Sequence, residues 1–240
     1  MKPVDVPTRE TVAFLASHLH VGAEILEVGC GKGHVAVELS RCGYPVIGLD
    51  SSPEVIAQAQ QRGARAIVAT WPEFDSFPVD AIAFTRSLHH ITPLRDAVRR
   101  ARELVRPTGS LLVEDFAFDE IHAATMHWFL DVLRSKRGTV LIRPVAGEFA
   151  TDLLGSEDPV ATWHRSRAHE LHSMAAMTRA IEESFTVRET QSVPYLYRHI
   201  VPVLDETREA AAFVDAVFQE EARLGQQGEI VLIGRRIVGS

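Results

Sequence analysis

In the first half of the chain, short runs of consecutive apolar residues alternate with longer stretches in which apolar residues recur every three or four positions. The short runs predict buried strands, and the longer stretches predict amphipathic helices. The predicted strands cover 25–28, 45–49, 65–69, 79–84 and 111–113, and the predicted helices cover 8–19, 34–41, a segment starting at Pro53, and 94–105. Such alternation is typical of an α/β fold in which helices cover both faces of a mainly parallel sheet.

The second half of the chain has a less regular pattern. It predicts helices at 121–133, 169–184 and 208–224, an extended segment at 186–195, a final strand at 230–237, and a loop region without a clear period at 138–159. A chain of 240 residues suits one domain with an added cap. We therefore expect a single domain over 1–240, with a core at 8–116, a cap or substrate insertion at 117–184, and C-terminal strands and a helix at 185–240.

The composition narrows the classes of partner. With 46% hydrophobic and 24% charged residues the chain is ordinary for a globular protein, and its formal net charge of -7 disfavours a nucleic-acid duplex as the main partner. No apolar run approaches the ~18 residues that a membrane span needs, and the first ten residues lack the apolar segment of a signal peptide. We expect a cytoplasmic protein without a nucleic-acid or membrane partner.

A glycine-rich segment joins the first predicted strand directly to the next helix. In Ile25-Leu-Glu-Val-Gly-Cys-Gly-Lys-Gly33, the three glycines can adopt positive φ and allow a ligand to approach the backbone. The N-terminus of the following helix offers unpaired N–H groups to an anionic group. Asp50 ends the second predicted strand, 19 positions after Gly31, where a carboxylate can accept hydrogen bonds from both hydroxyls of a ribose. The segment therefore predicts a nucleoside site.

Two ligands compete for this site. A dinucleotide-binding loop has an acidic residue at a similar spacing of about 20 residues, which makes an NAD-dependent oxidoreductase the alternative. That pattern requires a small residue at position 34, where this chain has His34, and the chain has no Tyr-x-x-x-Lys pair. The loop is better suited to a nucleoside with a short amino-acid tail. A non-catalytic regulator that binds the same cofactor is a third interpretation.

Four segments carry a family resemblance. Glu27-Val-Gly-Cys-Gly-Lys-Gly33 resembles the first motif of class I S-adenosylmethionine-dependent methyltransferases, and Gly48-Leu-Asp50 resembles the second. The stretches 79–91 and 102–113 resemble the fourth strand with its loop, and the turn into the fifth strand, of the small-molecule branch that includes quinone-biosynthesis methyltransferases. The resemblance covers about 8–116. It implies a Rossmann-like, seven-stranded mixed sheet with the last strand antiparallel.

The resemblance also implies ligands and site residues. S-adenosylmethionine would be the methyl donor, S-adenosylhomocysteine its product, and a small molecule the acceptor, in a monomer or homodimer. The residues expected at the cofactor, from the methionine tail to the adenine, are Glu27, Gly29, Cys30, Gly31, Gly33, Thr85, Arg86, Asp50, Ser51, Thr70 and Trp71. Relatives usually place an acidic residue after strand three to bond the adenine amine. This chain has Ala69-Thr-Trp-Pro72 there, so Thr70 or a backbone group would substitute and Trp71 would flank or stack on the adenine.

Catalytic residues are harder to predict, because displacement at a sulfonium needs alignment and water exclusion more than acid–base chemistry. His89 and His90 follow the fourth strand, where a histidine can accept a proton from a hydroxyl or an amine; a hydrogen bond to a neighbouring loop is the structural alternative. No metal-ligand motif is present, so five further histidines are interpreted as solvated or capping: His122, His127, His164, His169 and His172. Trp163, placed in a polar loop, is a candidate wall of the substrate site.

Overall fold

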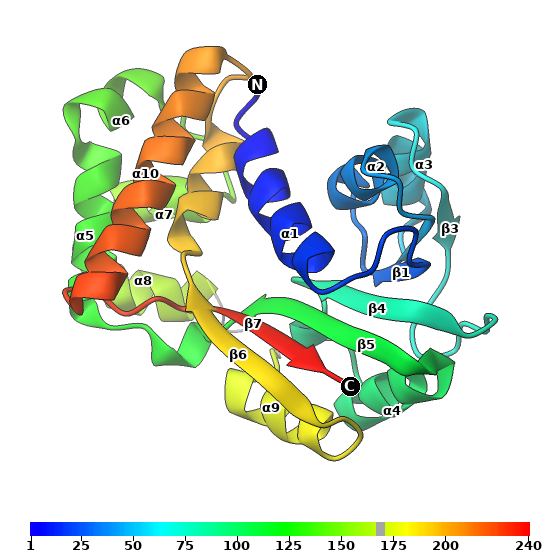
Figure 1. Ribbon diagram of the computed structural model, residues 1–240. Helices are drawn as coiled ribbons and strands as arrows, with labels where there is room; N and C mark the ends of the chain where they lie inside the picture. Colours follow the sequence, from blue (N-terminus) through cyan, green and yellow to red (C-terminus); the bar gives the residue numbers. More distant parts are fainter. Residues whose placement is uncertain (167–170) are drawn as a thin grey trace. The chain divides into compact units, whose positions relative to one another are not determined.

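In this computed structural model, residues 1–166 and 171–240 are described, and their strands form one seven-stranded sheet with the order β3-β2-β1-β4-β5-β7-β6 (Figure 1). The position of His169 therefore lies outside the described residues. The strands are β1 (Ile25–Val28), β2 (Val46–Asp50), β3 (Ala66–Val68), β4 (Val79–Thr85), β5 (Val105–Phe116), β6 (Val187–Val193) and β7 (Gly234–Gly239).

The pairing of the strands confirms the predicted mixed sheet. β1 runs parallel to β2 and β4, β2 to β3, and β4 to β5. At the other edge, Thr186 and Ser240 exchange backbone hydrogen bonds of 2.9 and 3.1 Å, which is the antiparallel pattern. The last strand is therefore antiparallel, as the family resemblance implied.

The chain folds as two compact units. The sheet unit consists of 8–115, 172–191 and 235–240, and the helical unit consists of 1–7, the described residues of 116–171, and 192–234. This division differs from the predicted insertion at 117–184. α9 (Met174–Glu182), which the prediction placed in the insertion, packs against α4 (Leu94–Leu104) of the sheet unit, and 192–234 completes the helical unit.

The sheet unit is organised by the alternation of side chains along its strands. Ile25 of β1 packs into a core shared with α1 (Asp5–Ser17), α2 (His34–Arg41) and α3 (Pro53–Gln61), whereas its neighbour Leu26 points to the opposite face. On that opposite face, Trp71 donates its indole N–H to the carbonyl of Ala97 in α4 at 3.0 Å. Helices thus cover both faces of the sheet, as predicted.

Helix boundaries in this unit follow local chemistry. The Ser52 hydroxyl accepts a hydrogen bond from the Val55 N–H at 3.3 Å, and Pro53 occupies the first helical position of α3. α4 ends at Leu104 and β5 begins at Val105. β5 is much longer than the predicted 111–113, because it continues through Pro107 on one side and to Phe116 on the other.

The helical unit contains the largest departures from prediction. The region 138–159 holds most of α6 (Lys136–Leu141), the whole of α7 (Phe149–Leu154) and the first residue of α8 (Pro159–Ser166), where a loop was predicted. Helices of six to eight residues give too few periods for a pattern to be read. The predicted strand at 230–237 is also wrong at its start, since β7 begins at Gly234.

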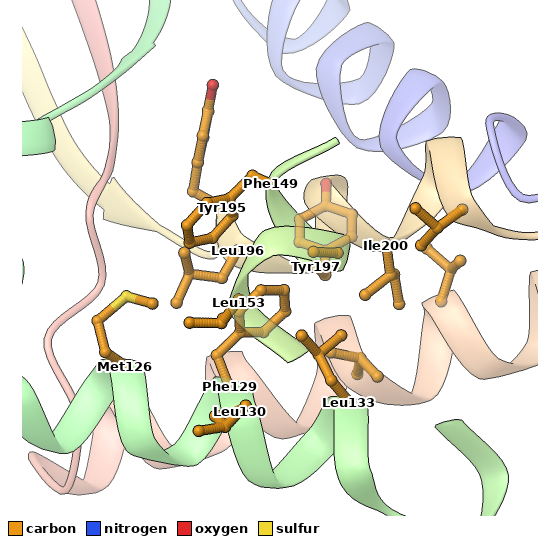
Figure 2. Packing of buried hydrophobic residues seen from close by; sticks show 14 of the residues in the cluster. Met126, Phe129, Leu130, Leu133, Phe149, Leu153, Tyr195, Leu196, Tyr197 and Ile200 are labelled. Carbon is orange, nitrogen blue, oxygen red and sulfur yellow. The ribbon is translucent and has the colours of Figure 1, made fainter. Parts of the chain in front are cut away.

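The core of the helical unit is formed by α5 (Ala123–Arg134), α7, α10 (Arg208–Gln227) and the 3₁₀ segment η3 (Leu196–Val203). In Figure 2, side chains of α5 such as Phe129 and Leu133 point toward those of α7 and η3. Within this core the buried carboxylate of Glu221 accepts the N–H groups of Tyr195, Leu196 and Tyr197 at 2.7, 3.0 and 3.1 Å. Burial raises the pKa of Glu221 to about 7, and these hydrogen bonds oppose the rise.

None of the helices in the described ranges is long and apolar enough to cross a membrane.

Candidate functional site

A cleft of about 430 Å³ lies within the sheet unit, at the carboxyl ends of β1, β2, β3 and β4. This is the edge where parallel sheets bind ligands, and the volume falls within the range of small-molecule sites. The lining residues are Val28, Gly29, Leu49, Asp50, Ser51, Ala69, Thr70, Trp71, Arg86, Ser87, His90, Ile91 and Thr92. Seven of the residues predicted to bind cofactor or act in catalysis therefore meet in one cleft: Gly29, Asp50, Ser51, Thr70, Trp71, Arg86 and His90.

The glycine loop has the conformation that its residue types require. Gly29, Gly31 and Gly33 have φ values of 73°, 53° and 75°, all in the left-handed region. A side chain at Gly29 would collide with Ser87, whose Cβ would lie 2.3 Å away. At Gly31, in contrast, no described atom would lie within 4 Å of an added Cβ, so the backbone is open there.

Gly33 belongs to the packing of the unit rather than to the lining of the cleft. It is the N-cap residue of α2, and a Cβ at this position would lie 2.9 Å from the Cβ atoms of Ala59 and Ala64. Close packing is therefore required at Gly33, whereas the dinucleotide pattern places its small residue at position 34. His34 is the first residue of α2.

Asp50 is fixed by the backbone on both sides. Its Oδ2 accepts the N–H of Gly31 at 3.1 Å, and its Oδ1 accepts the N–H of Ser52 at 3.0 Å. The carboxylate thus links the glycine loop to the start of α3 while it lines the cleft. A carboxylate accepts several hydrogen bonds at each oxygen, so Asp50 can also accept those of a bound diol.

Glu27 is buried at the end of β1. Its Oε1 accepts the hydroxyl of Thr85 at 2.7 Å, and among the described residues its Oε2 has no well-formed hydrogen bond. Burial raises the pKa of Glu27 to about 7, against the opposing effects of Thr85, the Arg86 charge and the backbone N–H of Ala36. Glu27 and Thr85 are both buried, and neither is among the residues that line the cleft.

Arg86 lines the cleft and has an unusual backbone conformation. Its φ of 64° places a non-glycine residue in the left-handed region, which is uncommon. Its guanidinium contacts Glu114 at 3.1 Å and the hydroxyl of Thr11 at 3.3 Å. Glu114 is almost fully buried at the end of β5, and it also accepts a hydrogen bond from Arg236 at 2.8 Å.

His89 and His90 lie in the short 3₁₀ turn after β4 (η1, Leu88–His90). The His89 Nδ1 lies 2.6 Å from Oδ1 of the fully buried Asp115, and the His89 backbone N–H donates to Oδ2 of the same carboxylate at 3.3 Å. The two imidazole rings are 4.0 Å apart between centroids. His90 is exposed and lines the cleft, whereas His89 is buried beside it.

Three further residues singled out in the sequence do not line the cleft. The side chain of Cys30 is packed in the core against Gly48, and burial is the main reason that its thiol pKa rises to about 12. Its backbone N–H donates to the carbonyl of Leu49 at 2.8 Å, and its carbonyl accepts the N–H of Gly33 at 3.0 Å. Trp163 lies in α8, fully buried, with its indole bonded to the carbonyl of Phe118, so its placement in a polar loop is wrong. His172 bonds the Ile91 carbonyl and the Thr92 hydroxyl.

Sequence reasoning missed the partners that hold the site. Asp115 and Glu114 were visible only as acidic residues near the end of a predicted strand. β4 and β5 are adjacent parallel strands, and their pairing places Thr85 opposite Glu114. This pairing is the signal that could have linked Glu114 and Asp115 to residues 85–89. In the described part of the chain, no group of three or more His, Cys, Asp or Glu side chains is placed to hold a metal ion.

Comparisons with known proteins agree on the family. The model of a methyltransferase domain matches residues 5–144. An uncharacterised methyltransferase of Mycobacterium bovis is 29% identical over 165 residues, which span 65% of this chain and 81% of that protein. A ubiquinone biosynthesis O-methyltransferase of Xylella fastidiosa is 31% identical over 101 residues, 38% of this chain and 41% of that protein.

Solved structures share the fold. A geranyl diphosphate C-methyltransferase of Streptomyces coelicolor, determined with Mg²⁺, geranyl diphosphate and S-adenosylhomocysteine, has a TM-score of 0.59 at 14% identity, covering 97% of this chain and 80% of that one. The family match covers more than half of the chain, including the glycine loop, Asp50 and the turn at His89. The chain therefore belongs to the class I S-adenosylmethionine-dependent methyltransferases.

Proposed function

We propose that this protein methylates a small-molecule acceptor, and that the cleft of the sheet unit holds the cofactor in an extended form. The observation that carries the proposal is the position of Asp50, which faces the same cleft as the glycine loop while backbone N–H groups fix its carboxylate. A fixed carboxylate beside an open loop is suited to a ligand in which a ribose diol lies next to a short tail.

The lining residues fit the parts of S-adenosylmethionine from one end to the other. Asp50 would accept the ribose hydroxyls, and Gly29 would allow the backbone to approach the ligand closely. Ser51, Thr70 and Trp71 would surround the adenine; because the indole N–H of Trp71 is already bonded to Ala97, Trp71 would contribute its ring face or edge rather than a hydrogen bond. The end of the cleft at Arg86, which follows Thr85 in the chain, would hold the methionine tail.

A small-molecule acceptor is supported by the relatives and by charge. One relative is named for ubiquinone biosynthesis, whose intermediates are small molecules. The net charge of -7 also disfavours nucleic acid as the acceptor, since phosphate binding needs a basic surface.

When bound, S-adenosylmethionine supplies a methyl group that is already activated by the sulfonium charge. The protein then has to align the acceptor and exclude water. Asp115 fixes the His89 ring so that Nδ1–H donates to the carboxylate, which leaves Nε2 as the basic nitrogen. His89, with the cleft-lining His90 beside it, would accept the proton of an acceptor hydroxyl or amine, and Asp115 would stabilise the resulting imidazolium.

Labelled methyl transfer tests this function. The protein is incubated with methyl-labelled S-adenosylmethionine and a bacterial lysate separated into metabolite, protein and nucleic-acid fractions. We expect label in the metabolite fraction, reduced in the Asp50→Ala variant. Label confined to a macromolecular fraction would overturn the small-molecule acceptor. Cofactor binding without any transfer would indicate a regulator that has kept the fold.

A further inference from the structure

His172 contacts the turn that carries His89 at two places. Its backbone N–H donates to the carbonyl of His89 at 2.9 Å. Its ring nitrogen Nε2 lies 3.0 Å from the carbonyl oxygen of Ile91 and 3.2 Å from the hydroxyl oxygen of Thr92. A residue 81 positions after Ile91 in the chain therefore binds the end of η1 from outside the turn.

These contacts satisfy carbonyl groups at the end of η1. Within the turn, the N–H of His90 donates to Ser87 and the N–H of Ile91 donates to Leu88, both at 3.1 Å. The carbonyl groups that follow project from the end of a 3₁₀ turn and need partners from elsewhere. His172 supplies one partner through its backbone and another through its ring.

The ring contact has a defined donor. The carbonyl of Ile91 can only accept, so the proton of this hydrogen bond lies on Nε2 of His172. Nε2 carries a proton both in one neutral tautomer and in the protonated ring, so the contact is kept whether or not the ring is charged. This is the behaviour of a group that holds a neighbour in place, rather than of one that exchanges a proton with it.

The backbone of His89 is held on both sides. Asp115, at the end of β5, accepts its N–H at 3.3 Å, and His172 donates to its carbonyl at 2.9 Å. The Asp115 carboxyl group also contacts Nδ1 of the ring at 2.6 Å. The turn therefore cannot rotate without breaking one of these contacts.

His172 is itself fixed by the helix that follows it. Ser173 is the N-cap residue of α9, and its hydroxyl accepts the N–H of Ala176 at 3.2 Å. α9 packs on α4 and on η1, and Glu183 at the end of α9 pairs with Arg95 of α4 at 2.8 Å. An anchored residue can hold a turn in place, whereas a loosely held one would move with it.

The residues that His172 holds belong to the cleft. Ile91 and Thr92 line it together with His90, whereas His172 does not. A displaced turn would move the rings of His89 and His90 relative to a bound ligand. Methyl transfer depends on alignment, and a displacement of about 1 Å can cost on the order of a hundredfold in rate.

We infer that His172 is a positioning residue for methyl transfer: it holds residues 88–92 so that the His89 ring and the cleft-lining His90 keep their places. The inference rests on the proposed function, because it takes His89 as the group that accepts the proton of the acceptor. A residue that only stabilised the fold would affect unfolding without a separate effect on rate.

The test separates the rate of transfer from cofactor binding. His172→Ala removes the ring contact and keeps the backbone N–H that donates to His89. Transfer is measured with methyl-labelled S-adenosylmethionine and the metabolite fraction of a bacterial lysate, and calorimetry gives the dissociation constant of S-adenosylhomocysteine. We expect the rate at saturating cofactor to fall on the order of tenfold, while the dissociation constant changes by less than about threefold.

Two further variants complete the comparison. In His172→Gln the side-chain amide N–H reaches about as far as Nε2 and can donate to the Ile91 carbonyl, so it should restore most of the rate. His127→Ala is the matched control, because His127 also bonds a backbone carbonyl, that of Ala123 at 2.8 Å, but within the helical unit. Its rate should equal that of the wild-type protein. Thermal unfolding confirms that each variant is folded.

A spectroscopic measurement does not require the acceptor. NMR of nitrogen-labelled histidine reports the surroundings of each imidazole ring. We expect the ring signals of His89 and His90 to shift or broaden in His172→Ala, and to keep their wild-type positions in His172→Gln and His127→Ala.

The outcomes distinguish this inference from the proposed function. A wild-type rate in folded His172→Ala, or unchanged ring signals of His89 and His90, would overturn the inference. Equal losses of rate and of cofactor binding would also overturn it, because the effect would then lie in the cofactor cleft. A wild-type protein that transfers no label would overturn the proposed function, and the ring signals would still decide whether His172 holds the turn.

Discussion

The imidazole of His89 and the carboxyl group of Asp115 form a buried pair, with Nδ1 of the ring 2.6 Å from Oδ1 of the acid. The same carboxyl group accepts the backbone N–H of His89, so it fixes both the ring and the turn that carries it. The two contacts orient the His89 ring beside the cleft-lining His90.

The Asp115→Asn variant tests whether the pair of His89 and Asp115 is catalytic or purely structural. The asparagine has one acceptor oxygen and can accept the Nδ1–H or the His89 backbone N–H but not both, so we expect a stability loss of about 1–3 kcal/mol. The ring then loses the negative charge that stabilises its protonated form, and methyl transfer should fall on the order of a hundredfold. Label transfer to the metabolite fraction and thermal unfolding measure the two effects. An unchanged rate would show that the acceptor reaches the cleft without a proton to lose.

Asp50→Ala should weaken binding of the ribose that the cofactor carries. Removing the carboxylate takes away its bonds to the ribose and frees the Gly31 and Ser52 N–H groups, so affinity should fall about tenfold to a hundredfold. Because the ribose is common to both ligands, S-adenosylmethionine and its decarboxylated form should be affected equally. Calorimetry with both ligands checks this. A loss confined to the carboxylate-bearing ligand would mean that the ribose binds elsewhere.

Gly29→Ala and Gly43→Ala form a matched pair. Both glycines have positive φ, 73° and 91°, so each alanine introduces backbone strain of about 1–2 kcal/mol. At Gly43 no described atom lies within 4 Å of the new Cβ, whereas at Gly29 it would meet Ser87 at 2.3 Å. Gly29→Ala should therefore cost a further 1–3 kcal/mol or so and also weaken S-adenosylmethionine binding. Equal losses in thermal unfolding would contradict this role of the loop.

The parts of the fold that the sequence predicts are those with local causes. The start of α3 follows from Ser52 and Pro53, and the glycine loop follows from residues that are adjacent in the chain. The clusters that hold the site depend on long-range pairs instead. Thr11 and Glu114 are 103 positions apart, and Arg236 reaches Glu114 across 122. No periodicity encodes such pairs, because they arise only when strand order brings β4, β5 and β7 together.

In the helical unit, prediction from the sequence is limited by the shortness of the helices. Its short helices at 136–141, 149–154 and 159–166 carry one or two turns each, so their apolar residues resemble those of a loop. They are stabilised by packing on α5 and η3 rather than by their own pattern. Trp163 illustrates the consequence: polar neighbours in the sequence suggested a loop at the substrate site, yet the residue is helical and its ring is fully buried among Phe149, Phe116 and His199.

Glu27 should make stability depend on pH in a direction opposite to that of most paired carboxylates. Burial raises its pKa from 4.5 to about 7, so the folded protein binds a proton that the unfolded chain has released. The resulting stabilisation is complete below pH 4.5 and is lost as the pH rises through about 7.

Glu27→Gln keeps an acceptor for Thr85 but cannot ionise. Between pH 5 and pH 8, the free energy of unfolding of the wild-type protein should therefore fall by about 2.5 kcal/mol relative to that of the variant. Denaturant unfolding at both pH values measures this difference, and because Glu221 titrates alike in both proteins, its contribution cancels. A constant difference would mean that Glu27 is already ionised in the folded protein at pH 5, held so by Arg86 and the Thr85 hydroxyl.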